Sequence, residues 1–230
     1  MKKRIFKLLL ALVAIATTAN AQENMVDGHE YVDLGLPSGT LWASCNVGAT
    51  KPEEYGLYFA WGETVGYTSD TSDGHSFNWG NYKWCAGAYD KQTKYCTKSD
   101  YGNNGFTDNK TELDLEDDAA YVNWGSNWCM PSFDQIKELL DNCNWEWTAL
   151  NGVYGRKAMS KKNGNSIFLP AAGWREYTSL SGAGSHGDYW SRSLNADYSS
   201  YAYGLFFRSG DVDWGYDSRY YGLSVRPVRR

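Results

Sequence analysis

Hydrophobic residues follow a helical spacing in two stretches of the chain, residues 115–122 and 132–143. The apolar positions on one face are Leu115, Ala119 and Val122 in the first stretch and Ile136, Leu139 and Leu140 in the second. Because residues three and four apart share a helix face, both stretches predict short amphipathic helices. Ser132 followed by Gln135 matches a capping box, which places the start of the second helix at Ser132.

Shorter runs of aromatic and β-branched residues, separated by Gly, Asn, Asp and Ser, predict strands on both sides of these helices. The expected strands are residues 31–34, 41–45, 55–61, 166–169, 188–194, 201–208 and 220–228. The first two flank a turn signal at residues 37–39 and predict a hairpin. Residues 66–110 are dense in Gly, Asn, Asp, Ser and Thr and predict a long ordered loop, anchored by Trp79 and Trp84. Helices in the middle and an antiparallel meander at the end predict an α+β fold.

The first 21 residues have the composition of a secretory signal peptide. Four basic residues precede or enter an apolar run over residues 8–18, and Ala19-Asn20-Ala21 is a small-x-small cleavage signal. The run is shorter than the about 20 residues that span a bilayer, and no cysteine follows the cleavage point to carry a lipid anchor. We therefore expect an exported protein in which residues 22–230 form a single domain.

The charge of the mature chain argues against a nucleic-acid partner. Removing residues 1–21 leaves 18 Lys and Arg against 27 Asp and Glu, a net charge of −9. Nucleic-acid binding requires a basic footprint. No later stretch is apolar and long enough to cross a membrane. We expect neither a nucleic-acid partner nor a transmembrane segment after signal cleavage.

The chain has five cysteines, and this odd number leaves at least one outside any intramolecular pairing. Export permits disulfides. Cys85 with Cys96 could close a short loop, and Cys45 with Cys143 is a second candidate pair, although spacing proves neither. A zinc site is disfavoured, because the chain has no CxxC and its three histidines are scattered.

Segments along nearly the whole mature chain fit one known pattern. The opening segment reads YVDLGLPSGTLWA (31–43), and the others read NVGA (46–49), YFAWGET (58–64), DDAA (117–120), NWCMPS (127–132), NGNSIFLPAAG (163–173), YWS (189–191) and SVRPV (224–228). Together these segments resemble the Fibrobacter succinogenes major paralogous domain family of the Bacteroidetes.

The resemblance implies a C-type-lectin-like fold, with relatives among formylglycine-generating enzymes and the variable proteins of diversity-generating retroelements. It implies two helices packed on a twisted antiparallel sheet, with long irregular loops. The chain departs from the family pattern at Cys129, where arginine is usual, and at Gln135 and Ile136, where an acid and an aromatic residue are usual. Cys129 is therefore the candidate for the cysteine outside any pair, and an inert buried residue is favoured over an intermolecular bridge.

Two kinds of catalytic chemistry lack their residues or motif in this chain, and a third, hydrolysis by paired carboxylates, is harder to exclude. The formylglycine-generating relatives use a cysteine pair near the C-terminus, whereas no cysteine follows Cys143. A Ser-His-Asp triad lacks its Gly-x-Ser-x-Gly motif, and His186 lies in a predicted turn. Acids are numerous, but no motif fixes two of them at a catalytic spacing. We therefore expect no enzyme, with a carboxylate-based hydrolase as the alternative.

One acidic stretch could supply oxygen ligands to calcium. Its carboxylates are Asp108, Asp114, Glu116, Asp117 and Asp118. The stretch does not match an EF-hand loop, and acids also suit the electropositive start of the helix expected at residues 115–122. We favour the helix-start interpretation, so no cofactor is expected and calcium is the alternative.

The segment from residue 188 to residue 221 has the composition of a recognition surface. Nineteen of its 34 residues are Asn, Asp, Ser or Tyr. Tyr and Trp offer large, stiff contact areas, and Ser, Asn and Arg offer adaptable or bidentate hydrogen bonds. The expected ligand-binding residues are Asn195, Asp197, Tyr198, Tyr201, Tyr203, Arg208, Asp211, Asp213, Trp214, Tyr216, Asp217 and Arg219. Most of them lie in two predicted loops, residues 195–201 and 211–219. The alternative is that these residues belong to an exposed, twisted sheet, since Tyr is a good strand former.

These observations predict an exported ligand-binding or adhesin-like protein that recognises a glycan or a host or bacterial surface protein. The retroelement-diversified relatives carry their variable residues in the same C-terminal segment. Asparagine codons mutated at adenines reach Tyr, Asp, Ser and Arg but not Lys, and lysine is absent after Lys162. A diversified variable protein fits this composition, and so does ordinary divergence among paralogues. The alternatives are the hydrolase and a structural cell-surface subunit. Periplasm, outer surface and secretion all remain open as locations.

Overall fold

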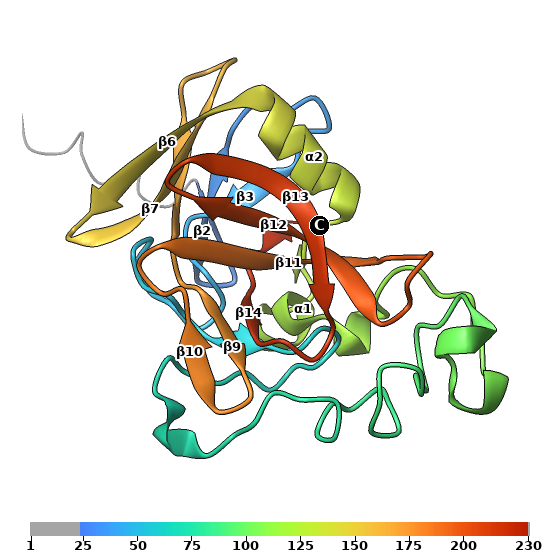
Figure 1. Ribbon diagram of the computed structural model, residues 1–230. Helices are drawn as coiled ribbons and strands as arrows, with labels where there is room; N and C mark the ends of the chain where they lie inside the picture. The colour runs from blue at the N-terminus through green and yellow to red at the C-terminus, as the bar shows by residue number, and fades with distance from the viewer. Residues whose placement is uncertain (1–23, 230) are drawn as a thin grey trace, which may run out of the picture.

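The computed structural model describes residues 24–229, so the expected signal peptide lies outside the described residues. The fold is mainly β, with 38% of the described residues in strands and 14% in helices (Figure 1). The expected α+β arrangement of two helices packed on a sheet is therefore wrong. Among the described residues, only one helix has seven or more residues.

The elements follow one another along the chain as short strands, two helices and then longer strands. The strands are β1 (Met25–Val26), β2 (His29–Asp33), β3 (Leu41–Ala43), β4 (Tyr58–Phe59), β5 (Trp128–Cys129), β6 (Cys143–Leu150), β7 (Val153–Ser160), β8 (Ser166–Pro170), β9 (Trp174–Glu176), β10 (Ser179–Ser181), β11 (His186–Leu194), β12 (Tyr201–Arg208), β13 (Asp211–Ser218), β14 (Leu223–Ser224) and β15 (Val228–Arg229). The helices are α1 (Ala119–Trp124) and α2 (Phe133–Asn142), and short 3-10 turns span Thr71–Asp73, Ser99–Tyr101, Asn103–Gly105 and Leu115–Asp117.

The centre of the fold is a five-stranded sheet in the order β13-β12-β11-β14-β4. Strands β11, β12 and β13 form an antiparallel meander, in which Leu205 lies between Tyr189 on one side and Trp214 on the other. Strand β14 pairs in parallel with β11 and antiparallel with β4. Strand β13 is therefore an edge strand, and α2 lies above the meander in Figure 1.

Hydrophobic clusters cover both faces of this sheet, as the alternation of side chains along a strand requires. On one face Leu205 packs in a cluster with Ile136 of α2. On the other face Trp190 packs in a cluster with Trp61 and Trp128. The apolar stripe predicted for α2 thus faces the sheet, and the meander is fixed from both sides.

Three smaller sheets complete the fold. Their strand orders are β1-β2-β3-β15-β5, β6-β7-β8 and β10-β9. The hairpin predicted around residues 37–39 is confirmed, because β2 pairs antiparallel with β3. The strand expected at residues 220–228 is instead two short strands, β14 and β15, which join different sheets.

The first predicted helix is shorter than expected, and its sequence explains why. Residues Leu115–Asp117 form a 3-10 turn, and Asp118 follows with an extended backbone. The Asp118 side chain accepts the backbone N–H groups of Ala120 and Tyr121, so it acts as the N-cap of α1. The predicted helix is therefore divided at Asp118, and α1 has only six residues.

The capping box predicted for α2 is confirmed. The Ser132 hydroxyl accepts the backbone N–H of Gln135 at 3.2 Å, and the Gln135 side chain accepts the backbone N–H of Ser132 at 2.9 Å. These reciprocal bonds satisfy two of the donors that a helix start leaves open.

Replacing Ser132 with alanine is expected to lower the free energy of unfolding by about 1 kcal/mol, because the first turn of α2 loses its cap. Urea unfolding followed by circular dichroism measures the change. Ser209→Ala, in the exposed turn between β12 and β13, is the control and should change stability by less than about 0.5 kcal/mol. Equal effects of the two variants would contradict the capping role.

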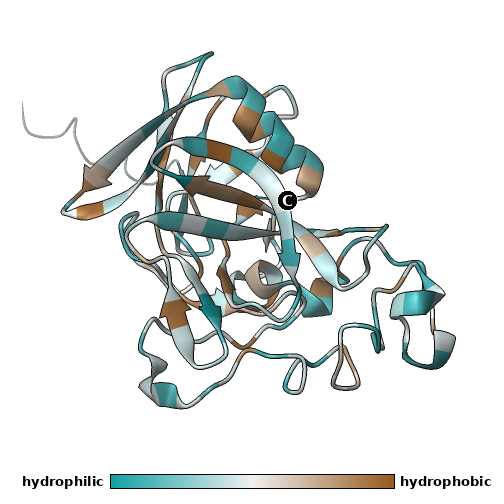
Figure 2. Ribbon diagram, in the orientation of Figure 1, coloured by the Kyte–Doolittle hydropathy of each residue, from teal (hydrophilic) through white to brown (hydrophobic). Residues whose placement is uncertain are grey.

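The long loop predicted for residues 66–110 is confirmed as irregular, with 3-10 turns and isolated bridges in place of strands. It runs along the bottom of Figure 1, and in Figure 2 most of it is teal or pale. Trp79 and Trp84 pack against the core as expected, and the Trp84 indole donates to the carbonyl oxygen of Gly62 at 2.8 Å. Partly buried aromatic residues therefore anchor the loop to the core.

No disulfide is present among residues 24–229. The thiols of Cys85 and Cys96 each donate to a nearby backbone carbonyl oxygen, at 2.9 and 3.1 Å. Cys45 and Cys143 belong to two different hydrophobic clusters. Neither of the two expected pairs is therefore formed in the structure.

Candidate functional site

Aromatic side chains gather where one face of the meander extends beyond α2. On this face Tyr203 lies opposite Tyr216, and Leu205 lies opposite Trp214. Leu205 is buried in the cluster with α2, whereas Trp214 and Tyr216 are exposed. We call the following residues the aromatic surface: Tyr89, Tyr101, Phe133, Tyr198, Tyr201, Tyr203, Trp214 and Tyr216.

The first residue of α2 organises one end of the aromatic surface. The ring of Phe133 stacks on Tyr203 with a centroid separation of 4.1 Å and meets Trp214 edge to face at 5.0 Å. The Lys137 ammonium lies 4.5 Å from the centre of the Phe133 ring. Because α2 is fixed by its cap and its buried stripe, it holds these rings in place.

Tyrosines from three segments continue the aromatic surface toward the long loop. Tyr216 contacts Tyr201 at 5.5 Å and Tyr198 at 6.3 Å between ring centres. Tyr198 in turn contacts Tyr101, and Tyr101 contacts Tyr89, each at 6.4 Å. The rings therefore form one connected series from the loop to α2.

Four rings of the aromatic surface are exposed to solvent, and the other four are partly buried. Tyr89 is 56% exposed, Tyr198 49%, Tyr216 48% and Trp214 44%. Contiguous exposed apolar area on a folded domain marks binding sites more often than isolated exposed residues do. Tyr and Trp also rank among the residues that contribute most to binding energy at interfaces.

The charged side chains of the expected site lie mostly apart from the rings. Arg208, Asp211 and Asp213 alternate along β12 and β13 with Tyr203, Trp214 and Tyr216, so they lie on the opposite face of the meander. Arg208 and Asp211 pair with each other at 3.1 Å and are both well exposed. Asp213 accepts the backbone N–H of Trp214 at 2.8 Å. Asp197 is exposed near Lys98, with their charged atoms 3.8 Å apart, and it shares the β11–β12 loop with Tyr198.

Two expected ligand-binding residues are buried. Arg219 is 0% exposed and donates to the carbonyl oxygens of Lys94, Tyr95 and Ser199. Asn195 is 3% exposed, and its side-chain oxygen accepts two backbone N–H groups that shape the β11–β12 loop. Neither side chain is open to a ligand at the surface.

Asp217 lies on the opposite face of the meander from the aromatic surface, since it pairs with Ala202, whereas Tyr216 pairs with Tyr203. Asp188 lies on that opposite face as well and is 8% exposed. Burial, and then the charge of Asp217, raises the pKa of Asp188 to about 7. Burial likewise raises the pKa of Asp217 to about 6, with the charge of Glu176 acting in the same direction.

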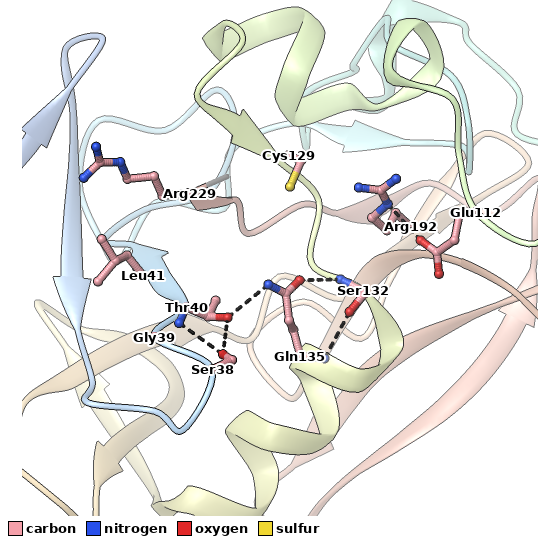
Figure 3. Close-up of a pocket in the computed structure, with 10 residues that line it drawn as sticks. All are labelled: Ser38, Gly39, Thr40, Leu41, Glu112, Cys129, Ser132, Gln135, Arg192 and Arg229. Carbon is pink, nitrogen blue, oxygen red and sulfur yellow. Dashed lines mark hydrogen bonds and ion pairs between the residues drawn. The ribbon is translucent and has the colours of Figure 1, made fainter.

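A cavity of about 510 Å³ lies beside the start of α2 (Figure 3). It is lined by Ser38, Gly39, Thr40, Leu41, Glu112, Cys129, Ser132, Gln135, Arg192 and Arg229. A second cavity of about 400 Å³ is lined by Leu34, Gly35, Pro37, Asn142, Ser160, Lys161 and Lys162. A hydrolase would need two close acids in a substrate-binding cavity. Asp188 and Asp217 are close acids with raised pKa values, but they line neither of these two cavities.

The acidic stretch considered for calcium is engaged in other contacts. Asp117 is bound by the ammonium of Lys94 and the hydroxyl of Tyr95, both at 2.6 Å. Asp118 caps α1 and also accepts the backbone N–H of Met130 at 2.9 Å. Within residues 24–229 no group of three or more His, Cys, Asp or Glu is arranged to hold a metal ion. Calcium dependence stays a prediction without a defined set of ligands.

Comparisons with known proteins found no matching family profile, no similar curated protein and no similar solved structure. The resemblance to the major paralogous domain family therefore stays a prediction. Across the described part of the chain, no helix has the length and apolar character needed to cross a membrane.

Three members of the aromatic surface were not predicted from the sequence: Phe133, Tyr89 and Tyr101. Phe133 occupies the first position of a predicted helix, where helical spacing alone does not indicate whether it is buried or exposed. Tyr89 and Tyr101 lie in the irregular loop. The available signal was composition, because large aromatic residues that do not fit an apolar stripe suggest contact surfaces.

Proposed function

We propose that this protein is exported and binds a glycan or a protein surface through the aromatic surface, as an adhesin-like or other ligand-binding protein. One observation supports this proposal most strongly: eight rings from four separate segments form a connected series outside the hydrophobic clusters, and four of these rings are exposed to solvent. Five of the rings, those of Phe133, Tyr201, Tyr203, Trp214 and Tyr216, are held by α2, β12 and β13, so little entropy is lost when a ligand orders them.

The side chains of the aromatic surface suit both kinds of ligand. The tyrosine hydroxyls and the exposed carboxylate of Asp197 can bind sugar hydroxyls while the rings stack on C–H faces. Tyr and Trp are also enriched where proteins recognise proteins. The charge of the mature chain gives no support to a nucleic-acid ligand.

Replacing Trp214 and Tyr216 together with alanine is expected to weaken binding at least about tenfold, because each removes an exposed anchor ring. Glycan arrays and arrays of bacterial and host surface proteins, each with and without calcium, measure the binding.

Tyr154→Ala is the matched control, since Tyr154 is 54% exposed on β7, outside the aromatic surface. Its binding should match that of the unmodified protein. If the double variant and the control bind the arrays equally well, the aromatic surface is not the binding site.

A further inference from the structure

The cavity beside α2 holds a convergent set of hydrogen-bonding groups that no part of the proposed function has yet used. Arg192 points into the cavity, and its Nε lies 2.8 Å from Oε2 of Glu112 (Figure 3). Their contact is an ion pair without the alignment of a hydrogen bond. The other carboxylate oxygen of Glu112 accepts the hydroxyl of Ser193. Glu112 is therefore oriented, and Arg192 retains N–H groups that can be donated to a ligand.

The opposite wall of the cavity is a chain of polar side chains fixed by one another. The Gln135 amide donates to the Thr40 hydroxyl at 3.0 Å, and the Thr40 and Ser38 hydroxyls lie 2.6 Å apart. Ser38 also donates to Glu138 at 2.6 Å. An amide nitrogen has two N–H groups, so Gln135 keeps one that is not used in this chain. Donors and acceptors are thus held in place before a ligand arrives.

The composition of the walls selects the chemistry of the ligand. Most side chains that line the cavity are polar or charged, and the exceptions are Leu41 and Cys129. An apolar ligand would therefore leave polar groups of the lining unsatisfied. An anion is disfavoured, because Glu112 already neutralises Arg192. The guanidinium of Arg229 lies over the ring of Tyr31 at 5.4 Å and points away from the centre of the cavity. Uncharged hydroxyl groups, which both donate and accept, fit this lining best.

The cavity adjoins the aromatic surface through two consecutive residues. Ser132 lines the cavity, and Phe133 stacks in the aromatic surface. The hydroxyl of Ser193 links the two, since it accepts the backbone N–H of Phe133 at 3.0 Å and donates to Glu112. The two sites are therefore neighbours at the start of α2.

We propose that the cavity between the start of α2, β5 and Arg192 binds one uncharged pyranose ring of a glycan whose further sugars lie on the aromatic surface. This inference rests on the proposed function and narrows its ligand to a carbohydrate. A volume of about 510 Å³ lies within the range of about 300–1,000 Å³ that small-ligand sites occupy.

Saturation-transfer NMR and calorimetry with methyl pyranosides of glucose, galactose and mannose test the cavity separately from the aromatic surface. At least one of them is expected to bind with a Kd in the range of about 1–20 mM. Arg192→Lys is expected to weaken this binding at least about fivefold, because lysine lacks the planar fork. Gln135→Glu is expected to do the same, since it keeps the capping acceptor for Ser132 but loses the amide donors.

Two controls separate failure of this inference from failure of the proposed function. Arg208→Lys changes another arginine paired with a carboxylate. Arg208 lies outside the cavity and on the face of the meander opposite to the aromatic surface, so this variant should leave Kd within about twofold. The double variant at Trp214 and Tyr216 should keep the monosaccharide affinity while losing array binding.

The inference is overturned if none of the methyl pyranosides binds at about 50 mM, or if methyl glucuronide binds more tightly than all of them. It is also overturned if Arg192→Lys binds as the unmodified protein does. Loss of array binding in the double variant would still support the aromatic surface in each of these cases.

Discussion

Replacing Asp188 with asparagine is expected to make the protein more stable at pH 8, less stable at pH 4, and less sensitive to pH between these values. Asp188 is 8% exposed, and its Oδ2 has no hydrogen-bond partner among the described residues. In the folded protein its pKa is raised to about 7 by burial and by the charge of Asp217. In the unfolded chain an aspartate has a pKa of about 4.

The sign follows from proton binding. The folded state holds the Asp188 proton more tightly than the unfolded chain does. The contribution of this proton to the free energy of unfolding is therefore fully present below about pH 4 and is lost as the pH rises through 7. At about 1.4 kcal/mol for each pH unit between the two pKa values, the loss at pH 8 is at most about 4 kcal/mol. Asparagine cannot ionise, but burying its amide without hydrogen-bond partners lowers the free energy of unfolding by about 1–3 kcal/mol. We expect a net gain of about 1–3 kcal/mol at pH 8.

Urea unfolding at pH 4, 6 and 8 measures this difference. Asp213→Asn is the control, because Asp213 lies on the same face of the meander as Asp188 but is exposed. The stability of this variant should follow that of the unmodified protein at every pH. Asp217 faces the same region, and burial raises its pKa to about 6, so some pH dependence should remain in Asp188→Asn. Parallel stability curves for the unmodified protein and Asp188→Asn would contradict the raised pKa.

Strands and caps that depend on neighbouring residues were predicted well from the sequence. The bounds of β12 match the expected strand at residues 201–208, and the capping box at Ser132 starts α2 as expected. Both signals are local: alternation within one strand and a spacing of three residues. The sequence at residues 151–152, Asn-Gly, was an unused local signal of the same kind. Both residues have positive φ, 49° and 86°, in the turn between β6 and β7.

Strand β13 shows why the fold class was wrong. Its sequence DVDWGYDS has the Asp, Gly and Ser content of a loop, yet it pairs with β12 over eight residues. An edge strand tolerates charged residues because one of its sides is open to water, and such charges also discourage pairing with other chains. Residues 211–218 form a strand because they pair with β12, and the local sequence does not identify that neighbour.

The residues of the candidate site could be predicted only in part, because composition identifies surface aromatic residues but not their tertiary neighbours. Tyr198, Tyr201, Tyr203, Trp214 and Tyr216 were expected from composition and are brought together by the register of β12 and β13. Phe133 joins them only because α2 packs on the meander. Contacts between residues about 70 positions apart follow from tertiary packing, which spacing along the chain does not encode.

Arg219 is the expected site residue whose role the structure reverses. Its guanidinium is fully buried 4.8 Å from the ring centre of Trp61. It donates from Nε to the hydroxyl of Tyr82 at 2.8 Å and from Nη1 to the carbonyl oxygen of Ser199 at 2.8 Å. Further bonds reach the carbonyl oxygens of residues 94 and 95. This one side chain therefore ties the long loop and the β11–β12 loop to the residue after β13.

Replacing Arg219 with methionine is expected to lower the free energy of unfolding by about 3–5 kcal/mol, since several buried acceptors lose a charged donor at once. Arg219→Lys should recover little of this loss, because a single ammonium cannot reach acceptors arranged around a planar fork. Urea unfolding measures both variants, and Arg208→Met, an exposed arginine in the same segment, should remain within about 0.5 kcal/mol of the unmodified protein. If Arg219→Met instead keeps its stability and loses array binding, Arg219 contacts the ligand and its placement in the buried network is incorrect.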